Sequence, residues 1–312
     1  MVITITLLGL GALTAAIAPR VVARGAWSDR EPVLALWMWQ CVVAAVLLCC
    51  VLAMAFSGAA AWRLVHGGVF APAPAQVVDA YALPDGDRVA AGLALLLACG
   101  GLWTAVALTR EVYRARVRRR RRRAELLARS PLLPGEVARS TGPLVVCEDE
   151  RPDAWLLPGS PPQLMITTAA LRRLNRRQLD AVLAHERGHA RARHHWLQHC
   201  AGALAGGFPG VPVFAAFQTQ VHRLVELSAD DMASRRFGRL TTALALVGLN
   251  EGRGVFGCAT EHTEVPQRVN RLLEPERRLS TARRLRLTAA VTLVPVVPLL
   301  VAFAPGLTAL HG

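Results

Sequence analysis

Two histidines and a glutamate in segment 181–189, Ala-Val-Leu-Ala-His-Glu-Arg-Gly-His, have the residue types and spacing of a metal site. On an α-helix four residues advance about 400°, so His185 and His189 lie on one face, roughly 6 Å apart along the axis. At that separation two imidazoles can bind one Zn²⁺, and Glu186 lies beside them to take a proton from a water on the metal. The alternative is a solvated helix that carries these residues by chance, so the rest of the chain must decide.

A catalytic zinc needs a third protein ligand from another element, and its fourth position is left for water. Segment 221–232, Val-His-Arg-Leu-Val-Glu-Leu-Ser-Ala-Asp-Asp-Met, has apolar residues at helical spacing and carries Glu226 and Asp230 on one face. We predict that Glu226 binds the metal and that Asp230 orients one ligand histidine through its second ring nitrogen. The alternative for this acidic pair is a solvated surface patch.

H-E-x-x-H followed at this distance by Glu-Leu-Ser-Ala-Asp resembles the gluzincin membrane peptidases. These include the HtpX-like and CAAX-prenyl endopeptidases and the related MecR/BlaR-type antirepressor metallopeptidases. The resemblance covers residues 140–275 by motif. It implies a zinc endopeptidase with one Zn²⁺ per chain, held by His185, His189 and Glu226, and with Glu186 as the catalytic base.

Residues that contact the substrate are harder to assign. His222 and Arg223 lie close to Glu226 in sequence and are candidates to stabilise the transition state. Segments 143–147, 154–159 and 163–167 are short, apolar and separated by turn residues, which predicts three strands. In zinc peptidases of this build, an edge strand above the metal pairs with the extended substrate. The expected edge strand consists of Ala154, Trp155, Leu156 and Leu157. The alternative is that the three strands only cap the helices.

The helix that carries the two histidines is expected to begin after Asn175, because Gln178 three residues later completes a capping-box pattern. We expect this helix to continue through Arg193 to His199. His195 and His199 are also four residues apart, but tryptophan follows His195 where a general base would be needed. We therefore interpret these additional histidines as a solvated or membrane-facing helix end.

The composition predicts a membrane protein. The 312 residues are 53% hydrophobic, yet the formal net charge is +14, and all 36 basic Lys+Arg residues are arginine. Apolar and charged residues are segregated, as in membrane spans joined by basic loops. Uncharged runs predict spans at residues 2–18, 33–62, 89–109 and 287–310, the last kinked by prolines. The expected fold is a mainly α membrane protein with about four transmembrane helices and an α+β zincin-like metallopeptidase domain that has a small edge β-sheet.

The distribution of arginine predicts the orientation in the membrane. The loops at 19–32, 110–123 and 277–286 are arginine-rich, whereas the loop at 63–88 and the C-terminal tail are not. By the positive-inside rule, the peptidase domain lies in the cytoplasm and both termini lie outside the plasma membrane. The expected domains are a three-span membrane domain (1–110), a cytoplasmic zinc metallopeptidase domain (111–286) and a fourth transmembrane helix (287–312).

The run from Arg114 to Arg123 has two interpretations. Arginine can neutralise nucleic-acid phosphates, but this run adjoins a span and has no interleaved aromatic residues for base stacking. We therefore expect it to contact anionic lipid, and we expect no nucleic acid partner.

The uncharged segment 200–221 limits how the site can form. A single crossing of the bilayer here would separate Glu226 from His185, so the segment must either return as a hairpin or pack against the peptidase domain or the membrane surface. Both arrangements remain open from the sequence.

Three spans, a zinc domain and one further span resemble the MecR/BlaR-type proteins without their extracellular penicillin-binding sensor domain. This resemblance implies a protein or peptide substrate, with a cytoplasmic transcriptional repressor in a signalling pathway as the leading expectation. One alternative is membrane-protein quality control of the HtpX kind. A second is a non-enzymatic membrane protein with a structural zinc site. The sequence gives no oligomeric state.

Overall fold

The computed structural model describes residues 2–23, 27–66, 87–129, 144–157, 163–250, 264–275 and 279–311. Within them the chain is mainly helical and has one small sheet, as predicted. The helices are α1 (Val2–Val22), α2 (Pro32–His66), α4 (Asp87–Arg129), α5 (Thr168–Arg173), α6 (Arg176–Arg191), α7 (His194–Gly207), α8 (Pro212–Phe237), α9 (Arg239–Asn250), α10 (Glu264–Leu273), α11 (Thr281–Leu293) and α12 (Val296–His311). The strands are β1 (Leu144–Cys147), β2 (Ala154–Leu157) and β3 (Gln163–Thr167).

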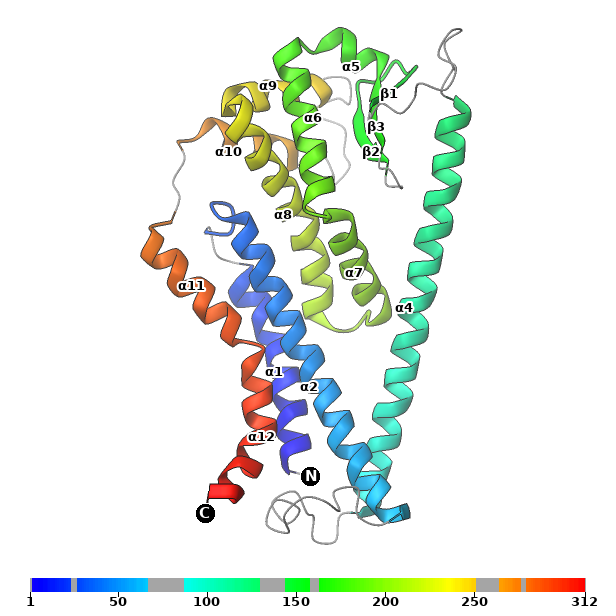
Figure 1. Ribbon diagram of the computed structural model, residues 1–312, viewed down its shortest axis with the longest axis vertical. Helices are drawn as coiled ribbons and strands as arrows, with labels where there is room; N and C mark the ends of the chain where they lie inside the picture. Colours follow the sequence, from blue (N-terminus) through cyan, green and yellow to red (C-terminus); the bar gives the residue numbers. More distant parts are fainter. Residues whose placement is uncertain are drawn as a thin grey trace.

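Several helices form an elongated body below the smaller helices and the sheet (Figure 1). Three segments of the described chain, Val2–Val22, Pro32–Ala59 and Leu95–Arg118, are long and apolar enough to cross a membrane. Helices α11 and α12, of 13 and 16 residues, are each too short for this test and pass it only as a pair, which is bent by 50° at a short break. Pro295 lies at this break and Pro298 in the first turn of α12, and both lack the N–H group that a continuous helix would use, which accounts for the bend.

Helix α4 does not end where the predicted third span ends. It continues as one helix from Asp87 to Arg129, so the arginine run from Arg114 to Arg123 lies on a helical extension rather than in a loop. Within this extension the Arg118 guanidinium donates to Glu111 at 2.8 Å. Figure 1 shows the extension rising along one side of the molecule to the level of the sheet.

The uncharged segment between the two ligand-bearing helices forms a helical hairpin, in which α7 and α8 are joined by a turn at 208–211. Pro212 occupies the first turn of α8, where backbone N–H groups have no acceptor within the helix, so its missing N–H removes no helical hydrogen bond. The hairpin packs against α1 and α2 in the largest buried apolar cluster, and Trp39 of α2 contacts Phe217 of α8 with ring centroids 6.5 Å apart. Because the chain returns, the second half of α8 lies beside α6 (Figure 1).

The sheet lies over α6 and has the strand order β1-β3-β2. Strand β1 is parallel to β3, and β2 is antiparallel to β3, so β2 is an edge strand of the described sheet. Ala154 of β2, Ile166 of β3 and Val182 of α6 belong to one buried cluster, which also includes Ala245 of α9. The sheet is thus fixed on the helix that carries the paired histidines.

Helix α6 is shorter than predicted. Its start agrees with the sequence, because Asn175 and Gln178 form the expected reciprocal capping box. Its end does not, because the helix stops at Arg191 and Arg193 adopts a left-handed conformation with φ of 52°. Helix α7 starts at His194 in a new direction. The predicted continuation to His199 is therefore wrong, and the break changes which histidine lies near the site.

Candidate metal centre

The paired histidines on α6 face each other through the same ring atom. Nε2 of His185 and Nε2 of His189 are 3.1 Å apart, which is the juxtaposition that the i, i+4 spacing predicts. The preceding turn of the helix, with Ala181, Val182 and Leu183, is buried and fixes the rotation of α6 about its axis. Both rings therefore point toward α8.

Glu226 of α8 completes a group of three metal-ligand atoms. Its two carboxylate oxygens lie 3.5 Å from Nε2 of His185 and 3.4 Å from Nε2 of His189. A tetrahedral zinc site with bonds of about 2.0–2.1 Å has edges of about 3.3 Å between ligand atoms. Each separation is close to that edge, the two contacts of Glu226 being made by its two different oxygens, and one ligand atom from each residue lies within 4.8 Å of the others. Two imidazoles and one carboxylate oxygen can therefore surround one Zn²⁺ and leave one position for another ligand.

Asp230 holds the ring of His185. Its Oδ1 lies 3.0 Å from Nδ1 of His185, so Nδ1–H donates to the carboxylate and the lone pair of Nε2 faces the metal position. The Asp230 side chain is only 2% exposed, which excludes competition from solvent for this contact. The structure thus brings Asp230 to the ligand histidine that it was expected to orient.

His194 has the equivalent position beside the other ligand histidine. Its Nδ1 lies 3.1 Å from Nδ1 of His189, and the imidazole is buried. If Nε2 of His189 binds a metal, Nδ1–H of that ring donates and Nδ1 of His194 accepts. Sequence reasoning missed this residue, because on a continuous helix five residues advance about 500° and would turn His194 away from His189. The break at Arg193 returns it to the site.

Arg268 of α10 joins both carboxylates of α8. Its Nε and Nη2 atoms donate to the two oxygens of Asp230 at 2.8 Å each, and Nη1 lies 2.9 Å from Glu226. Burial alone would raise the pKa of Glu226, but a hydrogen bond from His185 and the charge of Arg268 lower it to about 2. For Asp230 the same two partners outweigh burial and hold the pKa well below its usual range. Both carboxylates therefore stay ionised.

The two ligand histidines have opposite pKa shifts. Burial alone would lower the pKa of His185, but hydrogen bonds to Asp230 and Glu226 raise it to about 10. Burial lowers the pKa of His189 to about 4, since the attraction of Glu226 is offset by neighbouring positive groups. A histidine must be neutral to bind a metal, so a metal ion that bound at this group would displace the proton of His185.

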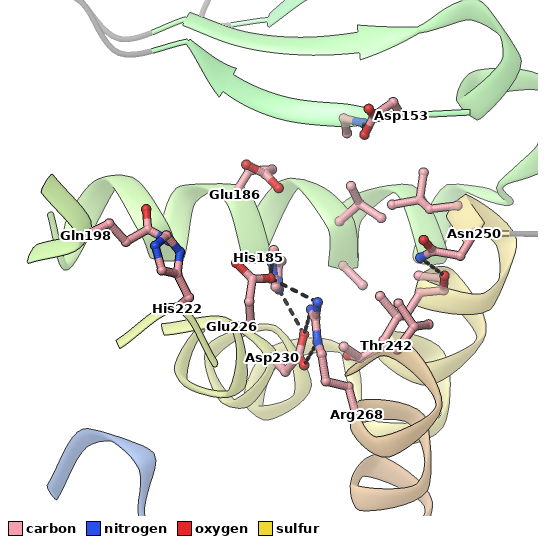
Figure 2. Close-up of a pocket in the computed structure, with 17 residues that line it drawn as sticks. Asp153, His185, Glu186, Gln198, His222, Glu226, Asp230, Thr242, Asn250 and Arg268 are labelled. Atoms are coloured by element: carbon pink, nitrogen blue, oxygen red, sulfur yellow. Dashed lines mark hydrogen bonds and ion pairs between the residues drawn. The ribbon is translucent and has the colours of Figure 1, made fainter. Parts of the chain in front are cut away.

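Glu186 has a different orientation from its neighbour. Figure 2 shows its carboxylate pointing from α6 into the space below the sheet, whereas His185 points toward Glu226. Glu186, His185 and Glu226 line one cavity of about 650 Å³, which lies between α6, β2, α8, α9 and α10. A carboxylate in this position can exchange protons with molecules in the cavity beside the metal position.

The two candidates for transition-state stabilisation lie in different places. His222 lines the cavity, and its Nδ1 is 3.5 Å from Nε2 of Gln198. Arg223 instead donates to Asp29, in the turn between α1 and α2, and to Gln220 at 3.1 Å. Successive side chains of a helix diverge by about 100°, and of these two only His222 lines the cavity.

The expected edge strand lies at the rim of this cavity. Ala154 lines it, whereas Trp155 packs on the opposite face of the sheet against Met165. The side chains of Leu156 and Leu157 lie outside the described set, but their backbone continues the strand.

In a comparison with protein-family models, residues 115–276 match the model described as Peptidase family M48. This span is just over half of the 312 residues and contains both ligand-bearing helices, the sheet and Arg268. No curated protein and no solved structure matches the chain. The match confirms the predicted metallopeptidase, while the narrower assignment to the MecR/BlaR type stays a prediction.

Metal content tests the ligand group. We expect purified full-length protein to hold one zinc per chain, and His185→Ala or Glu226→Ala to lose it, because either change leaves two ligands. We expect His194→Ala to bind zinc about 10–100-fold more weakly, since it removes only the group that orients His189. His199→Ala, on the same helix but outside the group, is the control. Elemental analysis and chelator competition measure both effects, and unchanged zinc content in Glu226→Ala would reject the ligand set.

Proposed function

The chain belongs to peptidase family M48, and we propose that it is a zinc-dependent, membrane-anchored endopeptidase that cleaves proteins or peptides at the cytoplasmic face. The observation that carries this proposal is the convergence of His185, His189 and Glu226, from two separate helices, at spacings that suit one Zn²⁺. A purely structural zinc site would have no need for the general base Glu186 beside an open coordination position.

In the proposed reaction, water adds to the scissile carbonyl carbon and the C–N bond breaks to give a carboxylate and an amine. Zn²⁺, when bound, supplies a Lewis acid that polarises the carbonyl and makes the attacking water more acidic. Glu186 accepts the proton of that water and passes it to the leaving nitrogen. Asp230 and His194 keep the rings of His185 and His189 in the tautomer that presents Nε2.

The backbone of β2 supports binding of an extended substrate. The Thr167 N–H donates to the Asp153 carbonyl at 3.0 Å, so Asp153 and Thr167 form a hydrogen-bonded pair of the antiparallel ladder between β2 and β3. In such a ladder every second residue of β2 points its N–H and C=O toward β3, and the residues between point theirs away. The backbone groups of Ala154 and Leu156 therefore point to the other edge of β2, above the cavity. The Ala154 N–H is held by the Asp153 carboxylate at 2.9 Å, so the Ala154 carbonyl and both backbone groups of Leu156 can pair with a substrate strand.

Of the two polar residues considered for the transition state, His222 suits the role better. It lines the cavity, where its ring can donate to the oxygen of the carbonyl under attack. Arg223 pairs with Asp29 away from the cavity, so we assign it to the contact between the α1–α2 turn and α8.

The proposed orientation in the membrane places the active site inside the cell. Both chain ends lie at the end of the molecule farthest from the sheet and from α6 (Figure 1). The arginine run Arg114–Arg123 follows the apolar part of α4 on the side of the peptidase half. We propose that this run contacts anionic headgroups of the inner leaflet, and that the α7–α8 hairpin enters the bilayer beside α2 without crossing it.

The substrate of the proposed peptidase belongs to one of two classes, a cytoplasmic repressor or damaged membrane proteins. Three spans before the peptidase domain and one after it support a cytoplasmic repressor substrate in a signalling pathway. The same catalytic residues would equally support quality control of membrane proteins.

Glu186→Gln separates catalysis from metal binding. Glutamine has the shape of the base but cannot accept the proton, so we expect proteolysis to fall by at least about 10²-fold. Zinc content should stay at the wild-type level, because Glu186 is not in the ligand group. The rate of cleavage of a denatured protein substrate by detergent-solubilised enzyme measures this effect. Full activity in this variant would refute the proposed base.

Single cysteines in a cysteine-free background test the orientation. In intact cells, a membrane-impermeant maleimide should label Gln76→Cys, in the segment between α2 and α4. It should label Arg235→Cys, at the exposed end of α8, only after lysis. Labelling of Arg235→Cys in intact cells would overturn the cytoplasmic location.

The Glu186→Gln variant can also trap the substrate. Crosslinking in cells followed by mass spectrometry should recover a soluble transcriptional regulator if the signalling proposal holds. Recovery of misfolded membrane proteins instead would support the quality-control alternative and reject the repressor.

A further inference from the structure

The turn that joins the first two helices contacts the elements that form the metal centre. It consists of residues 27–30, at the end of α1 and α2 nearest α10 (Figure 1). The backbone N–H groups of Arg30 and Glu31 both donate to the Trp27 carbonyl at 3.0 Å, and Trp27 packs against the apolar cluster that α1, α2, α7 and α8 share. The turn therefore has a defined shape, and its position follows that of the two candidate membrane helices.

Two arginines connect this turn to α8 and α10. Arg223 of α8 pairs with the Asp29 carboxylate, and Nε of Arg271 on α10 donates to the Asp29 backbone carbonyl at 2.6 Å. Arg271 also pairs with Asp231 of α8 at 2.8 Å. The turn, α8 and α10 together line a cavity of only about 40 Å³, roughly the space of one water molecule, so the three elements are in close contact here.

Helix α10 depends on these contacts for its position. It has only ten residues, and a helix of that length is marginal by itself, so packing against the rest of the protein must hold it in place. Arg268 and Arg271 are three residues apart and therefore lie on the same side of α10. Arg268 reaches Asp230, and Arg271 reaches Asp231 and the turn. The two arginine side chains are only 12% and 17% exposed, so solvent screens these contacts little.

The same contacts link the turn to the ligand carboxylate. Arg268 lies 2.9 Å from Oε2 of Glu226 and donates to both oxygens of Asp230. A shift of α10 away from the turn would withdraw this guanidinium and leave two buried carboxylates without their counter-charge. Glu226 would then lose the contact that fixes Oε2, and with it the orientation that brings its oxygens to His185 and His189.

We propose that the α1–α2 turn positions the metal ligand Glu226, because Asp29 holds Arg271 and thereby α10, whose Arg268 holds the carboxylate. Asp29 and Arg271 are positioning residues, since in the described chain neither belongs to the ligand group nor lines the cavity beside it. By linkage, a displacement of α1 relative to α2 weakens metal binding, and metal binding in turn restrains the turn. This inference rests on the proposed zinc peptidase, because it concerns the same centre.

Arg271→Gln tests the positioning in the full-length protein in detergent. It removes the contacts to Asp29 and Asp231, so we expect zinc to bind about 2–30-fold more weakly, the range for residues that act without touching the ligand. The visible absorption of the Co²⁺-substituted protein should change, because it depends on the geometry of the ligands. With saturating zinc, kcat should fall and KM should not change, since the walls of the substrate cavity are untouched. The matched control is Arg30→Gln, exposed in the same turn, which should match the wild type in all three measurements.

An exchange of charges tests the contact between the turn and α8. Asp29→Arg places a further cation beside Arg223 and Arg271, and it should weaken zinc binding as Arg271→Gln does. Arg223→Asp in the same chain restores a pair of opposite charges and should recover most of the lost affinity. Thermal unfolding of the zinc-free proteins shows whether each variant is folded. If Arg271→Gln does not fold, Arg271→Lys gives the same comparison with a smaller expected effect, because it keeps a cation beside Asp231.

The wild-type protein gives an independent measurement of the linkage. Hydrogen exchange in peptides that cover residues 27–31 should become faster when a chelator removes zinc, and unchanged exchange would overturn the linkage. The inference would also be overturned if Arg271→Gln and Asp29→Arg bound zinc as tightly as the wild type, or if Arg30→Gln weakened binding equally. A wild-type protein that bound no zinc would instead reject the proposed metal centre itself, so the two failures are distinguishable.

Discussion

The guanidinium of Arg268 allows two ionised carboxylates to lie close together inside the protein. Glu226 and Asp230 lie one turn apart on α8, and two ionised carboxylates at such a distance in a low-dielectric interior repel each other. Arg268 contacts both of them, which keeps both charged. An ionised Asp230 can accept from His185, and an ionised Glu226 can bind a metal. The whole centre therefore depends on α10 reaching α8.

The position of α10 depends in turn on the helices of the candidate membrane half. Arg271 of α10 pairs with Asp231 of α8 at 2.8 Å and donates to the backbone carbonyl of Asp29, in the α1–α2 turn, at 2.6 Å. Arg239 at the start of α9 donates to the carbonyls of Leu272 and Glu274 at the end of α10, where a helix leaves its carbonyls without partners. Together with the packing of α8 on α1 and α2, these contacts make the α1–α2 pair part of the architecture of the candidate metal centre.

The sequence predicts those neighbours in the site that follow from the period of a single helix. The i, i+4 spacing on α6 and α8 places His185 and His189 together, and Glu226 and Asp230 together, because a helix repeats every 3.6 residues or so. It misses His194, whose position depends on a left-handed residue at the end of α6 that no sequence signal indicated. The partners of Arg268 depend on how α10 docks, which no local pattern determines. The uncharged segment 200–221 indicated a return of the chain, and the structure shows the hairpin.

We propose that one zinc ion lies between α6 and α8 with two imidazoles and one carboxylate as ligands. X-ray absorption spectroscopy at the zinc edge tests this most directly on the purified, catalytically competent protein. We expect about four nitrogen or oxygen neighbours at about 2.0–2.1 Å, with the outer-shell scattering of two imidazole rings. Scattering from sulfur at about 2.3 Å, or the absence of imidazole scattering, would contradict it.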